Sequence, residues 1–401
     1  MNPYQETLRR RGMVKELAFP AAEYQARLTG TRHEMARRGL DVLLVHHVPN
    51  ICYLTGYQSP ATESYTCLAL GPGERAVLQL VEHVIPGAEL TSSLDELRPY
   101  RWYVPEGIPR QTAAIVRDLA GERSGVTIGL ERERPSLSVA VYEDLRAALP
   151  GATFVDASDL VYGQRVVKSP AELVCLRESG RITALGIEAA LDAIRPGTTD
   201  NDVAAAGYAA MIAAGSEYVS TQPFVARGLM SSLVHTTFKR RRIEAGETVF
   251  LEFASAYQRY GAPMMRSAVI GPPSPTVARL VEGVESTLEL LLTGIRAGRT
   301  AHDVARAASR GFARIRDEIY FQGAYAYHVG LSLPPNWWEG LTPYIAEGVH
   351  AELRAGMVFH MPVAARIPGV CGVALSETVA VTDSGCEILT SPTRAFRVVP
   401  L

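Results

Sequence analysis

The chain has 401 residues, which is long enough for two domains with substantial hydrophobic cores. Hydrophobic residues make up 47% of it and charged residues 20%, so the composition is that of a globular protein and excludes an intrinsically disordered one. The formal net charge of −2 gives no reason to expect nucleic acid or an anionic membrane as a partner.

Targeting and membrane segments are not expected. Residues 1–16 carry charges without an apolar stretch behind them, so they do not form a secretory signal, and no later run reaches the roughly 18 apolar residues of a membrane span. The cysteines are odd in number and widely separated, which indicates buried thiols and neither a disulfide framework nor a zinc site. We therefore expect a cytoplasmic protein.

Residues 1–163 are predicted to form an α/β domain. A helical apolar pattern at residues 21–38 precedes a short buried strand at 42–45, and the later patterns alternate in the same way, which favours a mostly parallel sheet. Residues 50–60 (NICYLTGYQSP) predict a turn-rich loop that could carry function on this scaffold. Further strands are expected at 65–69, 76–79 and 126–130, and helices at 108–120 and 136–149.

A second domain is predicted over residues 164–401. Residues 169–172 (SPAE) are a strong helix start, because Ser is a good N-cap, Pro fits the first helical position and an acid favours the first turn. We expect this helix to be long and amphipathic and to end near residue 194.

An internal repeat lies in the second domain. Residues 194–206 (IRPGTTDNDVAAA) and 295–307 (IRAGRTAHDVARA) match at an offset of 101 positions. In each copy a helix should end at the glycine and another should begin at Thr199 or Thr300, with an aspartate three residues on as a variant of the capping box. The repeat predicts two related halves about a pseudo-twofold axis, and a cleft between such halves is a natural small-molecule site.

One strand of this domain carries a buried acid. Residues 247–256 (ETVFLEFASA) predict a strand buried on both faces, and Glu252 lies within it. A carboxylate buried in that position must pair with a cation, accept hydrogen bonds or take up a proton. Because burying it is energetically unfavourable, such an acid usually indicates a functional site. The structural alternative is an ion pair of Glu252 with one of the arginines at 240–242 or with Arg266.

The C-terminal part adds further polar residues in apolar surroundings. A helix is expected to reach about residue 321, and an aromatic run follows at 325–338, in which two consecutive prolines forbid regular structure. Strands are predicted at 357–361 and 373–381, joined by a loop. The polar residues of this domain that lie in or beside apolar segments are His235, Glu252, Tyr327, His328, His360 and Glu377. Their number in one duplicated domain favours a functional site.

The order of these motifs resembles the pita-bread family, which includes methionine aminopeptidase, prolidase and creatinase. The resemblance covers essentially the whole chain and implies a creatinase-type α/β N-terminal domain followed by an α+β pita-bread domain with an internal duplication. It rests on the helix start at 169–172, the two repeat copies, the histidine before the strand, AYHVGL at 326–331, GMVF at 356–359 and ETVAVTDSGCEILT at 377–390.

The metallopeptidases of this family hold two divalent ions with two aspartates, one histidine and two glutamates. The resemblance places these positions on or near Glu252, Pro263, Tyr327, Pro362 and Ser376. A proline side chain cannot ligate a metal, and a lone serine or tyrosine is a poor ligand, so the resemblance implies a metal-free member without a cofactor.

Metal-free relatives hydrolyse C–N bonds of amidine-like substrates. Creatinase cleaves creatine, and ectoine hydrolase opens the cyclic amidine of ectoine to an N-acetyl-diaminobutyrate. Residues 250–266 and 327–339 resemble the ectoine hydrolases more, which implies a small cyclic amidine as the substrate. An acyclic guanidino substrate, an Xaa-Pro peptidase activity and a non-catalytic peptide-binding module are the alternatives.

The resemblance also implies roles for the candidate residues. His235 matches the family's catalytic histidine and is the expected proton shuttle. Glu252 and Glu377 would hold the N–H groups of the cation, or Glu252 would attack the amidine carbon. His360 would orient or relay, and the substrate contacts would come from Tyr327, His328, Arg266, Trp337, Tyr57 and Tyr65. Because relatives are homodimers and residues 50–57 match their dimer-contacting loop, we expect a homodimer in which this loop reaches the partner's site.

Overall fold

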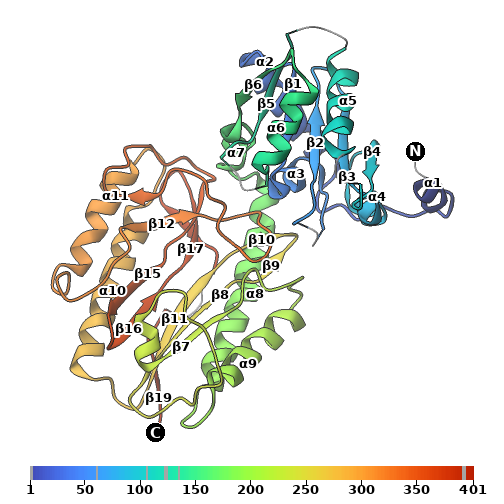
Figure 1. Cartoon of the computed structure of the whole chain (residues 1–401). Helices are drawn as coiled ribbons and strands as arrows, with labels where there is room; N and C mark the ends of the chain where they lie inside the picture. The colour runs from blue at the N-terminus through green and yellow to red at the C-terminus, as the bar shows by residue number, and fades with distance from the viewer. Residues whose placement is uncertain (1–2, 60–61, 105–106, 122–124, 134–135, 391–393) are drawn as a thin grey trace. The chain divides into compact units, whose positions relative to one another are not determined.

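The computed structural model of the chain describes residues 3–59, 62–104, 107–121, 125–133, 136–390 and 394–401 (Figure 1). Pro60, at the end of the loop predicted above, lies outside this part. The chain divides into two compact units, Met1–Arg165 and Val166–Leu401. None of the helices in the described ranges is long and apolar enough to cross a lipid bilayer.

The N-terminal unit is built on a mixed sheet with the strand order β4-β3-β2-β1-β5-β6. β1 (Val42–Val45) is parallel to β5 (Thr127–Leu130), which is parallel to β6 (Thr153–Asp156). β2 (Cys67–Leu70) is antiparallel to β1 and to β3 (Ala76–Val81), which in turn is parallel to β4 (Leu97–Tyr100). The sheet is therefore less parallel than expected, because the five residues between β2 and β3 are too few for a crossover helix.

Helices expected from the sequence are found in this unit. α2 (Ala21–Arg37), α5 (Ile108–Ala120) and α6 (Val139–Ala148) lie where the apolar patterns predicted them. Other helices in the described part of this unit are α1 (Pro3–Arg10), α3 (Val48–Thr55), η1 (Glu82–Val84), α4 (Ile85–Thr91) and α7 (Ser158–Arg165).

The loop predicted at residues 50–57 was wrong, since α3 covers most of it. Pro49 occupies the first turn, where proline is tolerated, and Gly56 ends the helix in the left-handed region at φ 81°. The carboxylate of Glu131 accepts hydrogen bonds from the backbone N–H groups of His46 and His47, just ahead of the helix. α3 is buried within the N-terminal unit, so its residues do not form an exposed loop, and the expected contact of residues 50–57 with a partner subunit stays a prediction.

The C-terminal unit has two halves, each with a pair of helices and a sheet. Figure 1 shows α8 and α9 on one side of the strands and α10 and α11 on the other. The first half contains α8 (Pro170–Ala193), α9 (Asp200–Ala213), β7 (Phe224–Arg227), η3 (Gly228–Ser232), β8 (Thr248–Phe253), β11 (Met264–Ile270) and, from the end of the chain, β19 (Arg397–Val399). The second half contains α10 (Pro275–Gly294), α11 (Ala301–Ala308), η4 (Ser309–Phe312), β12 (Ala324–His328), β13 (Ile345–Ala346), β14 (Val358–His360), β17 (Thr378–Val381) and β18 (Cys386–Ile388). Two hairpins, β9 (Ala256–Tyr257) with β10 (Tyr260–Gly261) and β15 (Val363–Ile367) with β16 (Cys371–Leu375), complete the unit.

The duplication predicted from the repeat is confirmed by matching hydrogen bonds. The N–H of Gly197 donates to the carbonyl of Ile243 at 2.9 Å, and the N–H of Gly298 donates to that of Leu353 at 2.9 Å. β8 begins five residues after the first of these acceptors (248 − 243) and β14 five residues after the second (358 − 353). The two halves therefore have equivalent turns and strands at the same spacing, as the predicted duplication requires.

The helix boundaries within the repeat differ slightly from the prediction. Thr199 and Thr300 are the N-caps of α9 and α11, as expected, and each hydroxyl accepts a hydrogen bond from the N–H three residues on. The preceding helices, however, end at Ala193 and Gly294, so the left-handed glycines lie in the connecting turns. The helix predicted to reach residue 321 is also shorter, since α11 ends at Ala308 and only a short 3₁₀ turn follows.

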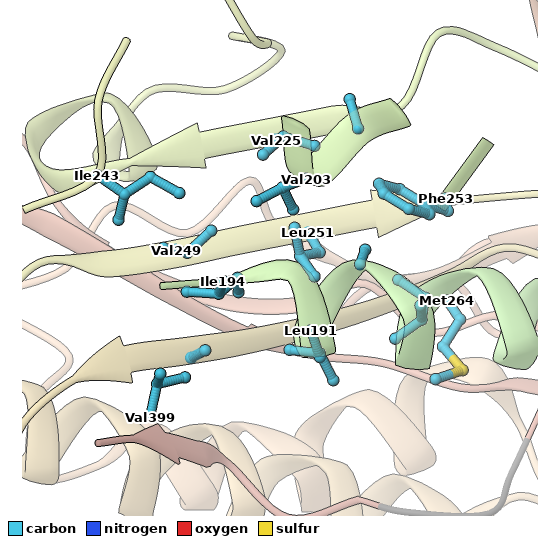
Figure 2. Close-up of a cluster of buried hydrophobic side chains, with 14 of the residues drawn as sticks. Leu191, Ile194, Val203, Val225, Ile243, Val249, Leu251, Phe253, Met264 and Val399 are labelled. Carbon is cyan, nitrogen blue, oxygen red and sulfur yellow. The ribbon is translucent and has the colours of Figure 1, made fainter. Parts of the chain in front are cut away.

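The apolar core of the first half lies between its helices and its sheet. Figure 2 shows Leu191 and Ile194 of the α8 end and Val203 of α9 directed toward Val249 and Leu251 of β8. Such alternate positions of β8 fill the core side of the sheet. The intervening positions, 250 and 252, therefore point to the opposite face of β8.

The strand predicted at 373–381 is interrupted, and the loop before it contains an unexpected strand. β16 ends at Leu375 and β17 begins at Thr378, because Ser376 and Glu377 make separate polar contacts. Residues 363–367 form β15 where a loop was predicted, and β15 pairs with β16 in register.

Candidate active site

Glu252 lies in the middle of β8, paired across the sheet with Met265 of β11 and Phe224 of β7. It is only 6% exposed, and within the described residues its carboxylate receives no hydrogen bond. Burial raises the pKa of Glu252 to about 8, and the positive charge of Arg366 opposes this rise. An acid in this condition is neutral in much of the folded protein at pH 7.

The positive charge that acts on the pKa of Glu252 belongs to Arg366, on β15. Its guanidinium lies 5.1 Å from the ring centroid of Phe250, which shares a face of β8 with Glu252. The ion pairs weighed from the sequence are not formed: Arg266 binds Glu377, and residues 240–242 make no ion pair with Glu252. The electrostatic partner of Glu252 was therefore not identified from the sequence.

A chain of hydrogen bonds runs beside Glu252. His360 Nδ1 lies 2.8 Å from the hydroxyl of Tyr327, and its Nε2 lies 2.7 Å from Ser376 Oγ. Ser376 Oγ in turn accepts a hydrogen bond from the N–H of Met265, the strand partner of Glu252. Burial lowers the pKa of His360 to about 3, so this imidazole is neutral and donates from one nitrogen while accepting at the other.

Tyr327 is held as a donor. Its hydroxyl accepts a hydrogen bond from Trp337 Nε1 at 2.9 Å. Burial, and secondarily the charge of Glu252, hold the pKa of Tyr327 well above its usual value, so the phenol keeps its proton. Because the indole N–H can only donate, it leaves the phenolic proton available for an acceptor, and His360 Nδ1 lies at hydrogen-bond distance.

His235 joins the same group of side chains through Phe224. Its imidazole stacks on the ring of Phe224 with centroids 5.4 Å apart, and that ring meets Trp337 edge-on at 6.0 Å. His235 is exposed and adopts a left-handed backbone with φ 59°, which is uncommon for a residue other than glycine and is often found at functional sites. The imidazole is thus one side chain away from Glu252 and open to water.

Glu377 differs from its expected role. Its Oε1 accepts from Arg266 at 2.7 Å and its Oε2 accepts from the hydroxyl of Thr390, and both charged side chains are fully buried. The guanidinium of Arg266 also donates to the carbonyl of Ser376. Arg266, expected as a substrate contact, thus binds Glu377, and the charge of Glu377 is already balanced by a buried guanidinium.

His328 also differs from its expected role as a substrate contact. Its neighbour Tyr327 pairs with His360 in the sheet, whereas His328 pairs with Phe359 and packs on its ring at 4.2 Å. Since successive residues of a strand point to opposite faces, His328 lies on the other face of β12 from Tyr327. Burial and the charge of Lys168 hold the pKa of His328 well below its usual value, so it is a neutral core residue.

Tyr57 and Tyr65 belong to the N-terminal unit. Tyr57 is buried directly after α3, and burial raises its pKa. The hydroxyl of Tyr65 lies 3.0 Å from that of Thr112 and 3.3 Å from His46 Nε2. Their expected contact with the substrate stays a prediction.

The donor set near Glu252 does not fit a pair of divalent ions. Tyr327 and Ser376, at two of the family's ligand positions, are both bound to His360, and at a third position Pro263 offers only its carbonyl, which accepts from Thr378. Within the described ranges, no three His, Cys, Asp or Glu side chains are grouped so that they could hold a metal. One carboxylate cannot balance two bridged cations.

Sequence reasoning missed Arg366 and Phe224. Arg366 was overlooked because residues 363–367 were assigned to a loop, although VAARI is a short, mostly apolar run with β-branched ends, which is consistent with a buried strand. Phe224 carried no signal of its own, since its place depends on the register of β7 against β8.

Known structures share this fold. The crystal structure of the dipeptidase PepE from Mycobacterium ulcerans superposes with a TM-score of 0.82 at 24% identity, covering 96% of this chain and all of that one. At this low sequence identity, the superposition shows that the two proteins share a fold and nothing more.

Curated relatives cover nearly the whole chain. Ectoine hydrolase from Halomonas elongata is 32% identical over 399 residues, covering 93% of this chain and 96% of that protein. An Xaa-Pro dipeptidase from Pyrococcus horikoshii is 25% identical over 360 residues, covering 90% of this chain and 95% of that protein. Residues 27–167 match the creatinase/prolidase N-terminal domain, and residues 174–383 match metallopeptidase family M24. The chain therefore belongs to metallopeptidase family M24, whose members are hydrolases of the pita-bread fold.

Proposed function

We propose that this protein hydrolyses a C–N bond of a small cyclic amidine, of the kind represented by ectoine, without a metal ion. The observation that carries the proposal is Glu252, a buried acid without a hydrogen-bond partner among the described residues and with its pKa raised to about 8. The similarity to an ectoine hydrolase over nearly the full length supports the same substrate class.

Glu252 is suited to hold a cation. An amidinium presents N–H donors beside a delocalised positive charge, and these supply both the hydrogen bonds and the charge that the carboxylate lacks. Binding of the cation favours the ionised form, so a protonated Glu252 releases its proton as the amidinium enters. Holding the charge against the carboxylate also fixes the orientation of the amidine carbon.

His235 is suited to move the proton of the attacking water. An amidinium carbon is already electrophilic, so hydrolysis requires a base for the water and an acid for the departing nitrogen. In the proposed reaction the water oxygen bonds to the amidine carbon while its proton passes to His235. The imidazolium then returns the proton to the ring nitrogen and the C–N bond breaks. The hydroxyl proton left on the new amide passes to the departing amine, so the ring opens to an amide and an ammonium group.

The Tyr327–His360–Ser376 chain supports this step from the other side. Its neutral imidazole and protonated phenol provide a donor whose position is fixed by Trp337. Tyr327 would donate to the oxygen that is added to the amidine carbon. Direct attack by Glu252 is the alternative, and it would leave an acyl-type adduct on that side chain.

The proposal is tested by incubating the protein with ectoine, hydroxyectoine, creatine and Xaa-Pro dipeptides, each with and without EDTA, and analysing the products by mass spectrometry. We expect ectoine to gain one water and to do so equally well with the chelator. Dipeptide cleavage that EDTA abolishes and Mn²⁺ or Co²⁺ restores would instead identify a metallopeptidase. The proposed assembly, a homodimer, is tested separately by light scattering.

A further inference from the structure

Arg366 is a buried cation that the proposed reaction leaves without a role. It is 5% exposed, and its Nε is hidden from water without a hydrogen-bond partner within the described residues. A guanidinium has five N–H donors, and leaving them unpaired in an apolar interior is costly. Burial lowers the pKa of Arg366, yet a guanidinium stays protonated in proteins, so the positive charge persists.

The fold directs this guanidinium toward Glu252. Ala364 lies two residues before Arg366 on β15, so both side chains point to the same face of the hairpin. Ala364 packs in an apolar cluster with Phe250 of β8 and Met265 of β11. Since Phe250 and Glu252 share a face of β8, the hairpin places Arg366 opposite the acid.

Arg366 and Glu252 act on each other electrostatically but are not joined by a hydrogen bond or an ion pair among the described contacts. Elsewhere in this unit, buried opposite charges meet directly: Lys168 with Glu339 at 2.6 Å and Arg266 with Glu377 at 2.7 Å. The separation of Arg366 from Glu252 therefore leaves the guanidinium able to receive an anion and the carboxyl group of Glu252 able to receive a cation.

We propose that Arg366 binds a carboxylate of the substrate, so that the site takes a zwitterion whose cationic end lies on Glu252 and whose anionic end lies on Arg366. This inference rests on the proposed function for the role of Glu252. A guanidinium matches a carboxylate with two parallel hydrogen bonds, which a lysine at this position could not reproduce. Arg366 is thus the residue that distinguishes carboxylated amidines from neutral or purely cationic ones.

The test compares two ligands and four proteins by isothermal titration. The ligands are ectoine and the same cyclic amidine without its carboxylate, and the proteins are the wild type, Arg366→Gln, Arg366→Lys and the control Arg279→Gln. Arg279 is an exposed arginine of the same unit, paired with Glu318, so its replacement removes one positive charge without touching the site. Thermal melting of each variant checks that it is folded.

We expect the wild type and Arg279→Gln to bind ectoine about 10- to 100-fold more tightly than the decarboxylated ligand, the size typical of charge-assisted hydrogen bonds. Arg366→Gln should bind the two ligands alike, and Arg366→Lys should recover part of the difference. Equal binding of both ligands to the wild type would overturn the inference. So would an equal loss for both ligands in Arg366→Gln, because it would show that Arg366 only balances the charge of Glu252.

Turnover measured on the same samples separates the inference from the proposed function. Binding that depends on Arg366 without hydrolysis would contradict the proposed function and leave the role of Arg366 standing. Hydrolysis of both ligands at equal rates would support the proposed function and contradict the role of Arg366. Creatine and Xaa-Pro dipeptides, each paired with its amide, extend the test to other zwitterions, and if no carboxylate form binds better than its amide, the inference fails.

Discussion

Burial keeps two titratable groups of the candidate site, Glu252 and His360, neutral near pH 7. The pKa of Glu252 rises to about 8, and the pKa of His360 falls to about 3. At pH 7 this group of side chains therefore includes a mostly protonated Glu252, a neutral His360 and the permanent positive charge of Arg366. The cationic substrate proposed above would displace the proton of Glu252, so its binding and the release of that proton would be coupled.

The first prediction concerns the stability of Glu252→Gln. In the unfolded chain a glutamate titrates near pH 4.5, whereas folded Glu252 titrates near 8. Between these values the folded state keeps a proton that the unfolded state has lost, so wild-type stability falls as the pH rises through this window, by up to about 1.4 kcal/mol per pH unit. Glutamine cannot ionise, so the Tm of the variant relative to the wild type should rise from pH 5 to pH 9 in thermal melts.

The matched control for that experiment is Glu347→Gln, an exposed glutamate of the same unit. Its Tm relative to the wild type should not vary with pH in the same way. A constant difference for Glu252→Gln would show that the carboxylate of Glu252 is ionised in the folded protein at all these pH values.

The second prediction concerns His235. His235→Ala should lower kcat by at least about 100-fold, the size typical of losing an acid or base. Because the residue has a left-handed backbone, His235→Asn is the better variant, since asparagine tolerates that conformation but cannot shuttle the proton. His350→Ala, at an exposed position, is the control. Near wild-type turnover by His235→Asn would remove His235 from the mechanism.

At the scale of elements, the strands that carry the candidate site are positioned by a close approach of two backbone segments. α8 passes so near to the end of β18 that a Cβ atom at Gly180 would lie 2.0 Å from the carbonyl oxygen of Leu389. The N–H of Leu389 donates to the carbonyl of Thr378, the first residue of β17. The contact at Gly180 therefore fixes the strand that follows Ser376 and Glu377.

The third prediction is that Gly180→Ala destabilises the protein. Alanine favours a helix by about 1 kcal/mol over glycine, but the clash is with backbone and cannot be relieved by a rotamer change, so we expect a net loss on the order of 1–3 kcal/mol in denaturant unfolding. Gly294→Ala is the control, because a Cβ there would meet only Val304 at 3.5 Å, an ordinary contact. Equal stability of the two variants would contradict the packing of α8 described here.

Local patterns predicted the elements whose signals are local. The N-cap and proline at the start of α8 were confirmed, with Ser169 and Glu172 forming a complete capping box, and the repeat correctly indicated two related halves. The errors occurred where tertiary contacts decide. Most of α3 was read as a loop because Asn50 and Gly56, at the ends of that stretch, are typical turn residues, and the break at Ser376 depends on a hydrogen bond to β11.

The site was predicted only where a residue type was itself unusual. Glu252 was found because an acid in an apolar strand is rare, and burial without a partner bears out that it is unusual here. Glu377 looked the same in sequence, yet Arg266 and Thr390 satisfy it. Whether a buried acid is free or paired depends on long-range neighbours that a local pattern does not contain.

At the scale of the whole molecule, the two halves share a plan but not the same chemistry. Glu252 lies nine residues after Ile243 (252 − 243), and the residue nine after the equivalent Leu353 is Pro362 (353 + 9). One half thus supplies an acid where the other supplies a proline. A dinuclear metal site placed between the halves would need carboxylates from both, so the divergence of the halves bears directly on metal binding.

The fourth prediction is that divalent ions do not stabilise this protein. A metal bound only to the folded state at 100 times its Kd adds about 2.7 kcal/mol, which corresponds to a rise in Tm of about 5–10 °C for a domain of this size. We expect Mn²⁺ or Co²⁺, added to protein previously treated with EDTA, to change the Tm by less than about 1 °C, because the described residues contain no group of three His, Cys, Asp or Glu side chains that could hold a metal. The Xaa-Pro dipeptidase from Pyrococcus horikoshii, treated in the same way, is the comparison. A rise of several degrees in this chain that also restores lost activity would show that residues other than those at the family's ligand positions hold a metal.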